Sequence, residues 1–263
     1  MILDILSNTN FFKQHINISS KYINNKPYPH IVIDNFLENN FANHLHDNTR
    51  STIKEVDVSN EFTQKNKTAC NDWSKFGRHT YDFISFLNSS LFLSFLENTT
   101  NFKGLISDSF LEGGGIHSVS KNGFLKMHSD FNWHNNSKLY RRINVILYLN
   151  KKWQKDMKGE LILSSKNFKN YISIEPIFNR LVIFNTNDKT YHGHPEKINF
   201  PEDYPRTSIA TYYYTRYRPF SEVARFKSTT TKYIPFIKDD IKTSNISLKK
   251  KIGYYLRRFT PFG

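Results

Sequence analysis

Two residues with metal-binding side chains stand two positions apart in the run His128-Ser129-Asp130. They end segment 124–130, which reads as a β-strand. Residues two apart on a strand point to the same face, so this imidazole and this carboxylate would lie side by side and could grip one ion. Alone, the pattern is weak evidence, because it occurs often by chance and a hydrogen-bonded surface pair explains it as well.

A second histidine motif, Tyr191-His192-Gly193-His194-Pro195, follows an apolar strand at 181–184 and a polar turn. We therefore expect His192 just beyond a strand end. With His128 and Asp130 it makes two imidazoles and one carboxylate, a set that caps one face of an octahedral ion. Non-haem iron(II) oxygenases use this facial triad, whose open positions hold a bidentate co-substrate and then O₂. A structural zinc site would need a fourth protein ligand.

An arginine opens a strand that is otherwise apolar or aromatic. Arg206, Ser208 and Ala210 share one face of segment 206–215. A guanidinium that points inward is costly unless it meets an anion, and its planar fork suits a carboxylate. We predict that Arg206 holds the distal carboxylate of 2-oxoglutarate and that Ser208 adds a hydroxyl donor. The alternative is an arginine that is exposed to solvent or paired with an acidic residue.

The elements that must position these residues are mostly predicted strands. Segments 36–50 and 80–97 have apolar residues at helical spacing, the second as one helix or a helix pair, and 51–72 is predicted as a surface loop. A short strand is predicted at 30–33, and from about residue 104 the period changes to two. The later predicted strands are 116–120, 124–130, 141–150, 160–164, 172–175, 180–186 and 206–215. Many short strands between turn signals predict a mainly β fold.

Composition and length narrow the possible classes of protein. The chain has 263 residues, which fits one large domain or two small ones. A single cysteine, Cys70, excludes an internal disulfide, a zinc ribbon and a cysteine-held iron–sulfur cluster. The sequence has no apolar run of about 18 residues and no signal-peptide pattern at its start. We therefore expect a cytoplasmic protein without a membrane span.

The net charge of +14 raises the question of an anionic partner. Lys and Asn are abundant throughout, which indicates compositional bias more than a binding stripe. The C-terminal run KKKIGYYLRRF places Lys249, Lys250 and Lys251 near tyrosines, a pattern that can bind nucleic acid or a membrane surface. We favour the alternative of a solvated helix face that packs its aromatic residues on the domain.

Five segments, in order, resemble the 2-oxoglutarate/Fe(II)-dependent dioxygenases of the prolyl 4-hydroxylase type, including the bacterial-type proline hydroxylases. They are PYPHIVIDNFL, GGGIH with GFLKMHSDFN, RRINVILYLN-KKW with KGELILSS, FNRLVIFNTNDKTYHGHPE and RTSIATYYYT. The resemblance covers about residues 27–218. One departure is visible: the family's Gly-Gly is Lys158-Gly159 here, which changes a turn and no ligand.

The resemblance implies a double-stranded β-helix core (jelly roll, cupin-like) with flanking N-terminal helices. It suggests three regions: a helical support region at 1–103, the Fe(II)/2-oxoglutarate dioxygenase core at 104–218 and a basic C-terminal extension at 219–263. Loops 51–76, 131–140 and 187–205 are expected to surround the mouth of the core and to govern the choice of substrate.

The resemblance also implies roles for individual residues. The implied iron ligands are His128, Asp130 and His192, since the family's distal histidine directly precedes a glycine. The implied contacts of 2-oxoglutarate are Arg206, Tyr148 and Ser208. Asn132, Asn144 and His194 are candidates for contact with the substrate or with a ligand. For Tyr148 a core tyrosine satisfied elsewhere is the alternative, and His117 and His134 are expected to be surface or hydrogen-bonded histidines.

The activity implied by the resemblance is hydroxylation of an unactivated C–H bond, with release of succinate and CO₂. It implies Fe(II), 2-oxoglutarate and O₂, with ascorbate as a further factor. Since related halogenases lack the carboxylate that Asp130 supplies, hydroxylation is favoured over halogenation. The expected substrate is a peptidyl proline, then a glycan or a small molecule. The competing hypothesis is a non-catalytic, metal-binding, cupin-like jelly roll that binds a sugar or small molecule, but such a binder needs neither Arg206 nor Tyr148.

Overall fold

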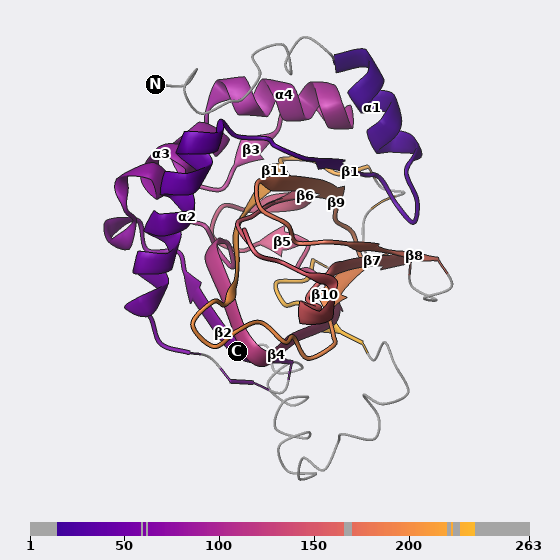
Figure 1. Ribbon diagram of the computed structural model, residues 1–263. Coiled ribbons are helices and arrows are strands. Elements are labelled where there is room, and N and C mark those ends of the chain that lie inside the picture. The colour runs from indigo at the N-terminus through magenta and orange to yellow at the C-terminus, as the bar shows by residue number, and fades with distance from the viewer. Residues whose placement is uncertain are drawn as a thin grey trace.

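The computed structural model describes residues 15–234, except 59, 62, 166–169, 220–221 and 223–226. Its centre is a curled antiparallel sheet of 12 strands, and its helices gather on one side of that sheet (Figure 1). The helices are α1 (His15–Asn24), α2 (Asn39–Lys54), α3 (Arg78–Leu87) and α4 (Ser90–Thr100), with short 3₁₀ turns η2 (Trp73–Lys75) and η3 (Lys155–Met157).

The strands confirm the predicted mainly β character of the chain. They are β1 (His30–Ile33), β2 (Gln64–Cys70), β3 (Ile106–Ser107), β4 (Gly115–Ser129), β5 (Trp133–His134), β6 (Leu139–Tyr148), β7 (Leu161–Ser165), β8 (Tyr171–Ile174), β9 (Arg180–Asn185), β10 (Thr190–His194), β11 (Arg206–Thr215) and β12 (Lys232–Tyr233). The main path runs β1-β9-β6-β11-β4-β10-β7-β8, with β2, β3, β5 and β12 attached at its sides. This order interleaves strands that are distant in sequence.

The long strand β4 joins the two halves of the curled sheet. The sequence predicts two strands here, whereas the structure has one, which passes through Asn122 at a φ of 63°. Its first half pairs with β11 (Arg206↔Val119) and its second half pairs with β10 (His192↔His128). One strand therefore brings the segment that carries Arg206 and the segment that carries His192 into the same cavity.

The predicted loop at 51–72 is wrong in part. Helix α2 runs on to Lys54, and residues 64–70 form β2, which pairs with β4 (Lys67↔Val119). The sequence of β2, QKNKTAC, has a single β-branched residue and no aromatic residue, so it carries no strand signal. Pairing with a strand that is already in place decides its conformation.

The main apolar core lies between the helices and the outer face of the sheet. Helix α2 contributes Leu45, α3 contributes Phe83 and α4 contributes Phe92, all fully buried. The predicted helix pair is confirmed: α3 ends before Asn88, and the side chain of Ser89 accepts a hydrogen bond from the Phe92 amide to begin α4. Alternation along β6 turns its other face into the sheet's interior, where Asn144, Ile146 and Tyr148 line a cavity.

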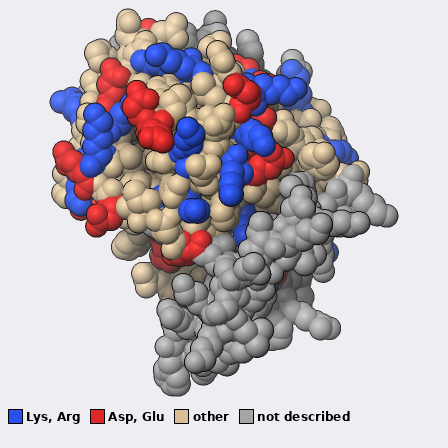
Figure 2. Space-filling model, turned by 60° about the horizontal axis from the view of Figure 1, so that its bottom comes forward, with Lys and Arg blue, Asp and Glu red and all other residues tan. Residues whose placement is uncertain are grey.

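The face shown in Figure 2 carries Lys and Arg interspersed with Asp and Glu. On that face the net charge therefore does not form a stripe of one sign. The basic run at 249–258 lies outside the described residues. In the part of the chain that the structure describes, no helix is long and apolar enough to cross a membrane. The division at residues 103 and 218 stays a prediction, and β1 and β2 of the first region belong to the same sheet as the rest.

The contribution of the Asn179 hydrogen bonds to holding the helices on the sheet can be tested by substitution. Its buried side chain accepts a hydrogen bond from the Leu37 amide and donates one to the Leu37 carbonyl, both at 2.8 Å, and its φ is 60°. We expect Asn179→Ala to lower the free energy of unfolding by about 2–4 kcal/mol, since it leaves two buried backbone groups unpaired and strains the turn.

The measurement is urea denaturation of both variants and wild type. Asn179→Gly, which relieves the backbone strain but also removes both hydrogen bonds, should lose less. The exposed Asn40→Ala is the control and should change the free energy by less than about 0.5 kcal/mol. An Asn179→Ala protein as stable as this control would contradict the assignment.

Candidate metal centre

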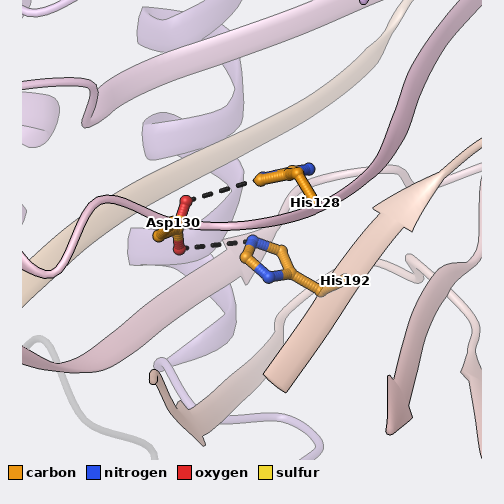
Figure 3. Close-up of side chains that lie close together, drawn as sticks. All are labelled: His128, Asp130 and His192. Atoms are coloured by element: carbon orange, nitrogen blue, oxygen red, sulfur yellow. Dashed lines mark ion pairs between the residues drawn. The ribbon is translucent and has the colours of Figure 1, made fainter. Parts of the chain in front are cut away.

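His128, Asp130 and His192 come together at one end of the cavity. His128 lies near the end of β4, Asp130 follows that strand, and His192 is opposite His128 on the neighbouring strand β10. Their potential ligand atoms all lie within 4.8 Å of one another. Figure 3 shows the Asp130 carboxylate facing both imidazoles, with Oδ1 at 3.5 Å from His128 Nε2 and Oδ2 at 3.5 Å from His192 Nε2.

His192 was expected just beyond a strand end, and the structure corrects this placement. It lies in the middle of a separate strand, β10, which begins at Thr190 after a turn built on Asn187. The pattern Thr-Tyr-His-Gly-His is short and rich in histidine, so it carries a poor strand signal. Pairing with β4 on one side and β7 on the other fixes it as a strand.

The hydrogen bond of His128 and the burial of His192 prepare both rings to bind a metal. His128 Nδ1 is 2.8 Å from the Lys126 carbonyl, which can only accept, so Nδ1 carries a proton and Nε2 is the nitrogen that faces Asp130. Burial lowers the pKa of His192 to about 3, although Asp130 acts in the opposite direction. The Nε2 atoms of both imidazoles therefore face one carboxylate.

The Asp130 carboxylate is held by two side chains that point into the cavity from β6. Arg141 Nη2 and Asn144 Nδ2 each donate a 2.8 Å hydrogen bond to Oδ2. Asn144 Oδ1 in turn accepts from Arg141 Nε at 3.0 Å, and the guanidinium lies 3.3 Å from the centre of the Tyr212 ring. Burial alone would raise the pKa of Asp130, but Arg141 and His192 outweigh it and hold that pKa well below its usual range.

Arg141 is a site residue that the sequence analysis missed. Strict alternation from Asn144 would place Arg141 on the opposite face, toward the helices. The register of β6 against β11 skips one residue, because Tyr213 pairs with Ile143 and Tyr214 pairs with Arg141. The extra residue, Arg142, is a β-bulge, and it turns Arg141 to the cavity face.

Arg206 lies in the cavity, which has a volume of about 230 Å³. It is 5% exposed, and among the described residues its partners are a carbonyl and a hydroxyl and include no acid, which argues against the alternative stated for it. Its Nε donates to the Gly159 carbonyl at 2.7 Å, and its Nη2 lies 3.4 Å from the Tyr148 hydroxyl. The Tyr148 hydroxyl therefore meets Arg206 inside the cavity, and it forms no other hydrogen bond within the described residues.

The surroundings of Gly159 explain why a residue other than glycine is accepted at position 158 but not at position 159. Gly159 has a φ of +83°, and a Cβ on it would lie 3.0 Å from Arg206 Cδ. Lys158 also has a positive φ, 56°, but its side chain reaches outward to Glu196 at 3.0 Å. The glycine that lies against Arg206 is thus the one that this chain keeps.

The remaining predicted residues are distributed as follows. Ser208 and His194 line the cavity, but His194 is not part of the His–Asp–His cluster. Asn132 is not among the lining residues, since its side chain bonds to Asp188 at 2.8 Å and to the Ser228 amide at 2.9 Å. His117 lines the cavity, and His134 is buried with Nδ1 accepting from the Ser137 amide at 3.1 Å.

Segment 227–234 lies beside the His–Asp–His cluster, a placement that the sequence analysis did not predict. Its strand β12 pairs with β4 so that Tyr233 stands opposite His128, and the two ring centres are 5.3 Å apart. Thr231 and Tyr233 both line the cavity. Asn132 holds this segment through its bonds with Ser228. A short stretch of the C-terminal region therefore forms part of the cavity wall.

The burial of His192 leads to a pH prediction for the metal-free protein. Its folded pKa of about 3 lies below the ordinary value of 6.5, so the unfolded chain takes up the proton first as the pH falls. The stability is complete above pH 6.5 and is lost from there toward pH 3. At pH 5 this group alone should cost about 2 kcal/mol.

Urea denaturation at pH 7 and pH 5 in the presence of a chelator measures this loss. The matched variant is His192→Gln, which has no titrating group, and its loss between the two pH values should be smaller by that amount. Equal losses in the two proteins would contradict the prediction.

The hydrogen bonds to Asp130 lead to a second prediction. We expect Asn144→Ala to weaken Mn²⁺ binding by about 10- to 100-fold, since it removes one donor to Oδ2 and the acceptor that orients Arg141. Isothermal titration calorimetry on the full chain measures the dissociation constant. Asn135→Ala, an exposed asparagine outside the cavity, is the control. A change below about twofold in a folded Asn144→Ala protein would show that these bonds do not position the carboxylate.

Comparison with known proteins finds a matching family model and similar solved folds. Residues 114–214 match the family model of the 2OG-Fe(II) oxygenase superfamily. No curated protein sequence matches the chain. Among solved structures, one similar fold is a prolyl hydroxylase from Trichoplax adhaerens, in complex with a peptide fragment of the hypoxia inducible factor oxygen degradation domain. It is 17% identical with a TM-score of 0.57, over 79% of this chain and 94% of that one.

Two further solved structures have the same fold. A prolyl-4-hydroxylase from Pseudomonas putida is 16% identical with a TM-score of 0.54, over 76% of this chain and 99% of that one. HygX from Streptomyces hygroscopicus, with nickel, 2-oxoglutarate and hygromycin B bound, is 12% identical with a TM-score of 0.53, over 84% and 97%. At these identities the likeness concerns the fold.

The family match begins just before β4 and ends within β11, so it spans the strands that carry the His–Asp–His cluster, Tyr148 and Arg206. The curled sheet is the jelly roll that the sequence predicted. Residues 114–214 are thus similar to the 2OG-Fe(II) oxygenase superfamily, which confirms the resemblance predicted from the sequence.

Proposed function

We propose that this protein is a dioxygenase that hydroxylates an unactivated C–H bond of its substrate, with conversion of 2-oxoglutarate to succinate and CO₂. The observation that carries the proposal is the content of one cavity. A cluster of two imidazoles and an ionised carboxylate shares it with a buried arginine that forms no ion pair with an acid in the part of the chain that the structure describes. The first set binds a metal and the second binds a carboxylate.

The donor set fits Fe(II). Two imidazole nitrogens and one carboxylate oxygen form a facial triad and leave positions for a co-substrate. His128, Asp130 and His192 would hold the ion. Because Arg141 and Asn144 both bond to Oδ2, we expect Oδ1 to be the oxygen that binds it. The iron and 2-oxoglutarate, when bound, supply the oxidising chemistry, and the protein supplies binding and orientation.

Arg206 is suited to hold the distal carboxylate of 2-oxoglutarate. The bond from its Nε to the Gly159 carbonyl fixes the plane of the guanidinium and leaves its terminal nitrogens for an anion. Tyr148 can add a hydroxyl donor, and Ser208 lies on the same strand face as Arg206. Apolar side chains of Val119, Ile146 and Leu161 line the same cavity and limit the entry of water.

For the substrate, a peptidyl proline is the first proposal. The Trichoplax adhaerens protein, which shares the fold, is a prolyl hydroxylase in complex with a peptide fragment. HygX, with the same fold, is bound to hygromycin B, so a glycan or another small molecule is the second proposal. Ascorbate remains a proposed supporting factor.

The test is an anaerobic titration of the full chain with Fe(II) and 2-oxoglutarate, followed by visible absorption. We expect a weak charge-transfer band in wild type that is lost in His192→Ala and kept in His194→Ala. In Arg206→Gln the band should require at least about tenfold more 2-oxoglutarate, since a charged, two-point contact is lost.

The other possible results of this titration would change the proposal in different ways. A band that survives in His192→Ala but is lost in His194→Ala would keep the function and move the third ligand to His194. The absence of a band in folded, iron-loaded wild type would overturn the proposal and favour a metal-binding jelly roll without catalysis. Release of succinate with candidate substrates is then the measure of turnover.

A further inference from the structure

The cavity contains more positive charge than the proposed reaction accounts for. Its lining residues include three basic side chains, Lys67, Arg141 and Arg206, and one acidic side chain, Asp130. Arg141 is paired with Asp130 at 2.8 Å. Arg206 is the anchor proposed for 2-oxoglutarate. Lys67 is left without a role in binding either the metal or, by that proposal, the co-substrate.

Lys67 lines the cavity and follows an irregularity in the pairing of β2 with β4. Lys65 pairs with Phe124 and Lys67 pairs with Val119, so Asn66 alone on β2 lies opposite residues 120–123 of β4. Asn66 has a φ of 49°. Its amide donates to Asn60 Oδ1 at 2.9 Å and its side chain donates to the Lys121 carbonyl at 2.7 Å. These bonds hold the backbone of β2 directly before Lys67.

The surroundings of the Lys67 ammonium are poor in negative charge. Within the described residues Lys67 forms no ion pair, and its ammonium donates no hydrogen bond. Burial lowers the pKa of Lys67, with Asp130 and Glu61 opposing that shift and Arg206 adding to it. His117 also lines the cavity, and burial keeps its pKa well below the usual range, so it is neutral.

The charges of the loaded cavity do not cancel. A divalent iron and a dianionic 2-oxoglutarate balance each other, and Asp130 balances Arg141. Arg206 and Lys67 then remain as two positive charges that nothing in the loaded cavity offsets. Holding a partly buried ammonium away from water without an anion is unfavourable, so a site keeps such a group where an anion arrives to pair with it.

We propose that Lys67 binds an anionic group of the substrate, such as a carboxylate, and that this dioxygenase therefore acts on an acidic molecule or an acidic segment of one. The inference rests on the proposed function and adds the chemical class of its substrate. Charge complementarity of this kind selects among partners more than it sets the overall affinity. A neutral analogue of the same shape leaves the ammonium unpaired.

The competing source of the anion is the distal carboxylate of 2-oxoglutarate, which Lys67 would then share with Arg206. The two possibilities predict different effects on the affinity for 2-oxoglutarate when the charge of Lys67 is removed. If Lys67 serves the substrate, its loss leaves the affinity for 2-oxoglutarate almost unchanged. If it serves the co-substrate, its loss weakens 2-oxoglutarate in the same manner as Arg206→Gln.

The experiment uses Lys67→Met, which keeps the length of the side chain and removes its charge. Lys65→Met is the matched control, since Lys65 lies on the same strand but is exposed to solvent. Full-length proteins are loaded anaerobically with Fe(II) and 2-oxoglutarate. Each is then titrated with compounds in pairs that differ only by a carboxylate or its amide: N-acetylproline and N-acetylprolinamide, acetyl-Asp-Pro and acetyl-Asn-Pro methylamides, and glucuronate and glucuronamide. The readout is the shift of the visible band when a molecule binds beside the metal.

We expect wild type and Lys65→Met to bind the acid of at least one pair at least about tenfold more tightly than the amide, which is about 1.4 kcal/mol. In Lys67→Met this preference should fall below about twofold, with the affinity for 2-oxoglutarate changed by less than about twofold. A preference that survives in Lys67→Met, or no preference for acids in wild type, would overturn the proposal. A tenfold loss of 2-oxoglutarate affinity in Lys67→Met would overturn it in favour of the co-substrate. Absence of the band in wild type would instead refute the proposed function itself.

Discussion

A buried, ionised carboxylate is the constraint on which the rest of the site depends. Asp130 has lost most of its contact with water, and the cost of that loss is offset only because Arg141 and Asn144 both bond to Oδ2. Arg141 is itself buried, and the rings of Tyr212 and Phe131 pack on its guanidinium at 3.3 and 4.6 Å. A bulge in β6, an aromatic stack from β11 and the end of β4 must therefore all be in place before the carboxylate can face the two histidines.

The curled sheet supplies this arrangement through one strand. Strand β4 pairs with β11 near its start and with β10 near its end, so it places the arginine of β11 and the histidine of β10 in one cavity. The four helices contact the outer face only, where Ile143, Val145 and Leu147 of β6 pack against them. The outer faces of these strands therefore pack in the apolar core, and their inner faces carry the residues of the site. Polar residues such as Asn144 can alternate with core residues at little cost to packing.

The sequence predicted the parts of the site that depend on regular alternation. His128 with Asp130, and Asn144 with Tyr148, lie on the expected faces because their strands are regular between them. Arg141 escaped prediction because the extra residue Arg142 reverses the alternation counted from Asn144. Lys67 escaped prediction because its segment was predicted as a surface loop. The strand β2 escaped because its residues have little β propensity, and only pairing with β4 makes it a strand. A bulge and an induced strand are tertiary properties, so no local pattern announces them.

Arg141 and Lys67, which the sequence analysis did not predict, have different effects on the net charge of the cavity. Arg141 is neutralised by Asp130 and so fixes a ligand without changing the balance, whereas Lys67 lies apart from any acid at hydrogen-bonding distance among the described residues and changes it. A cavity that needed only a metal and 2-oxoglutarate would be served by one uncompensated cation, Arg206. The second cation follows Asn66, whose two hydrogen bonds hold the backbone there, and it is the feature of this chain that points beyond binding of a metal and 2-oxoglutarate toward a choice of substrate.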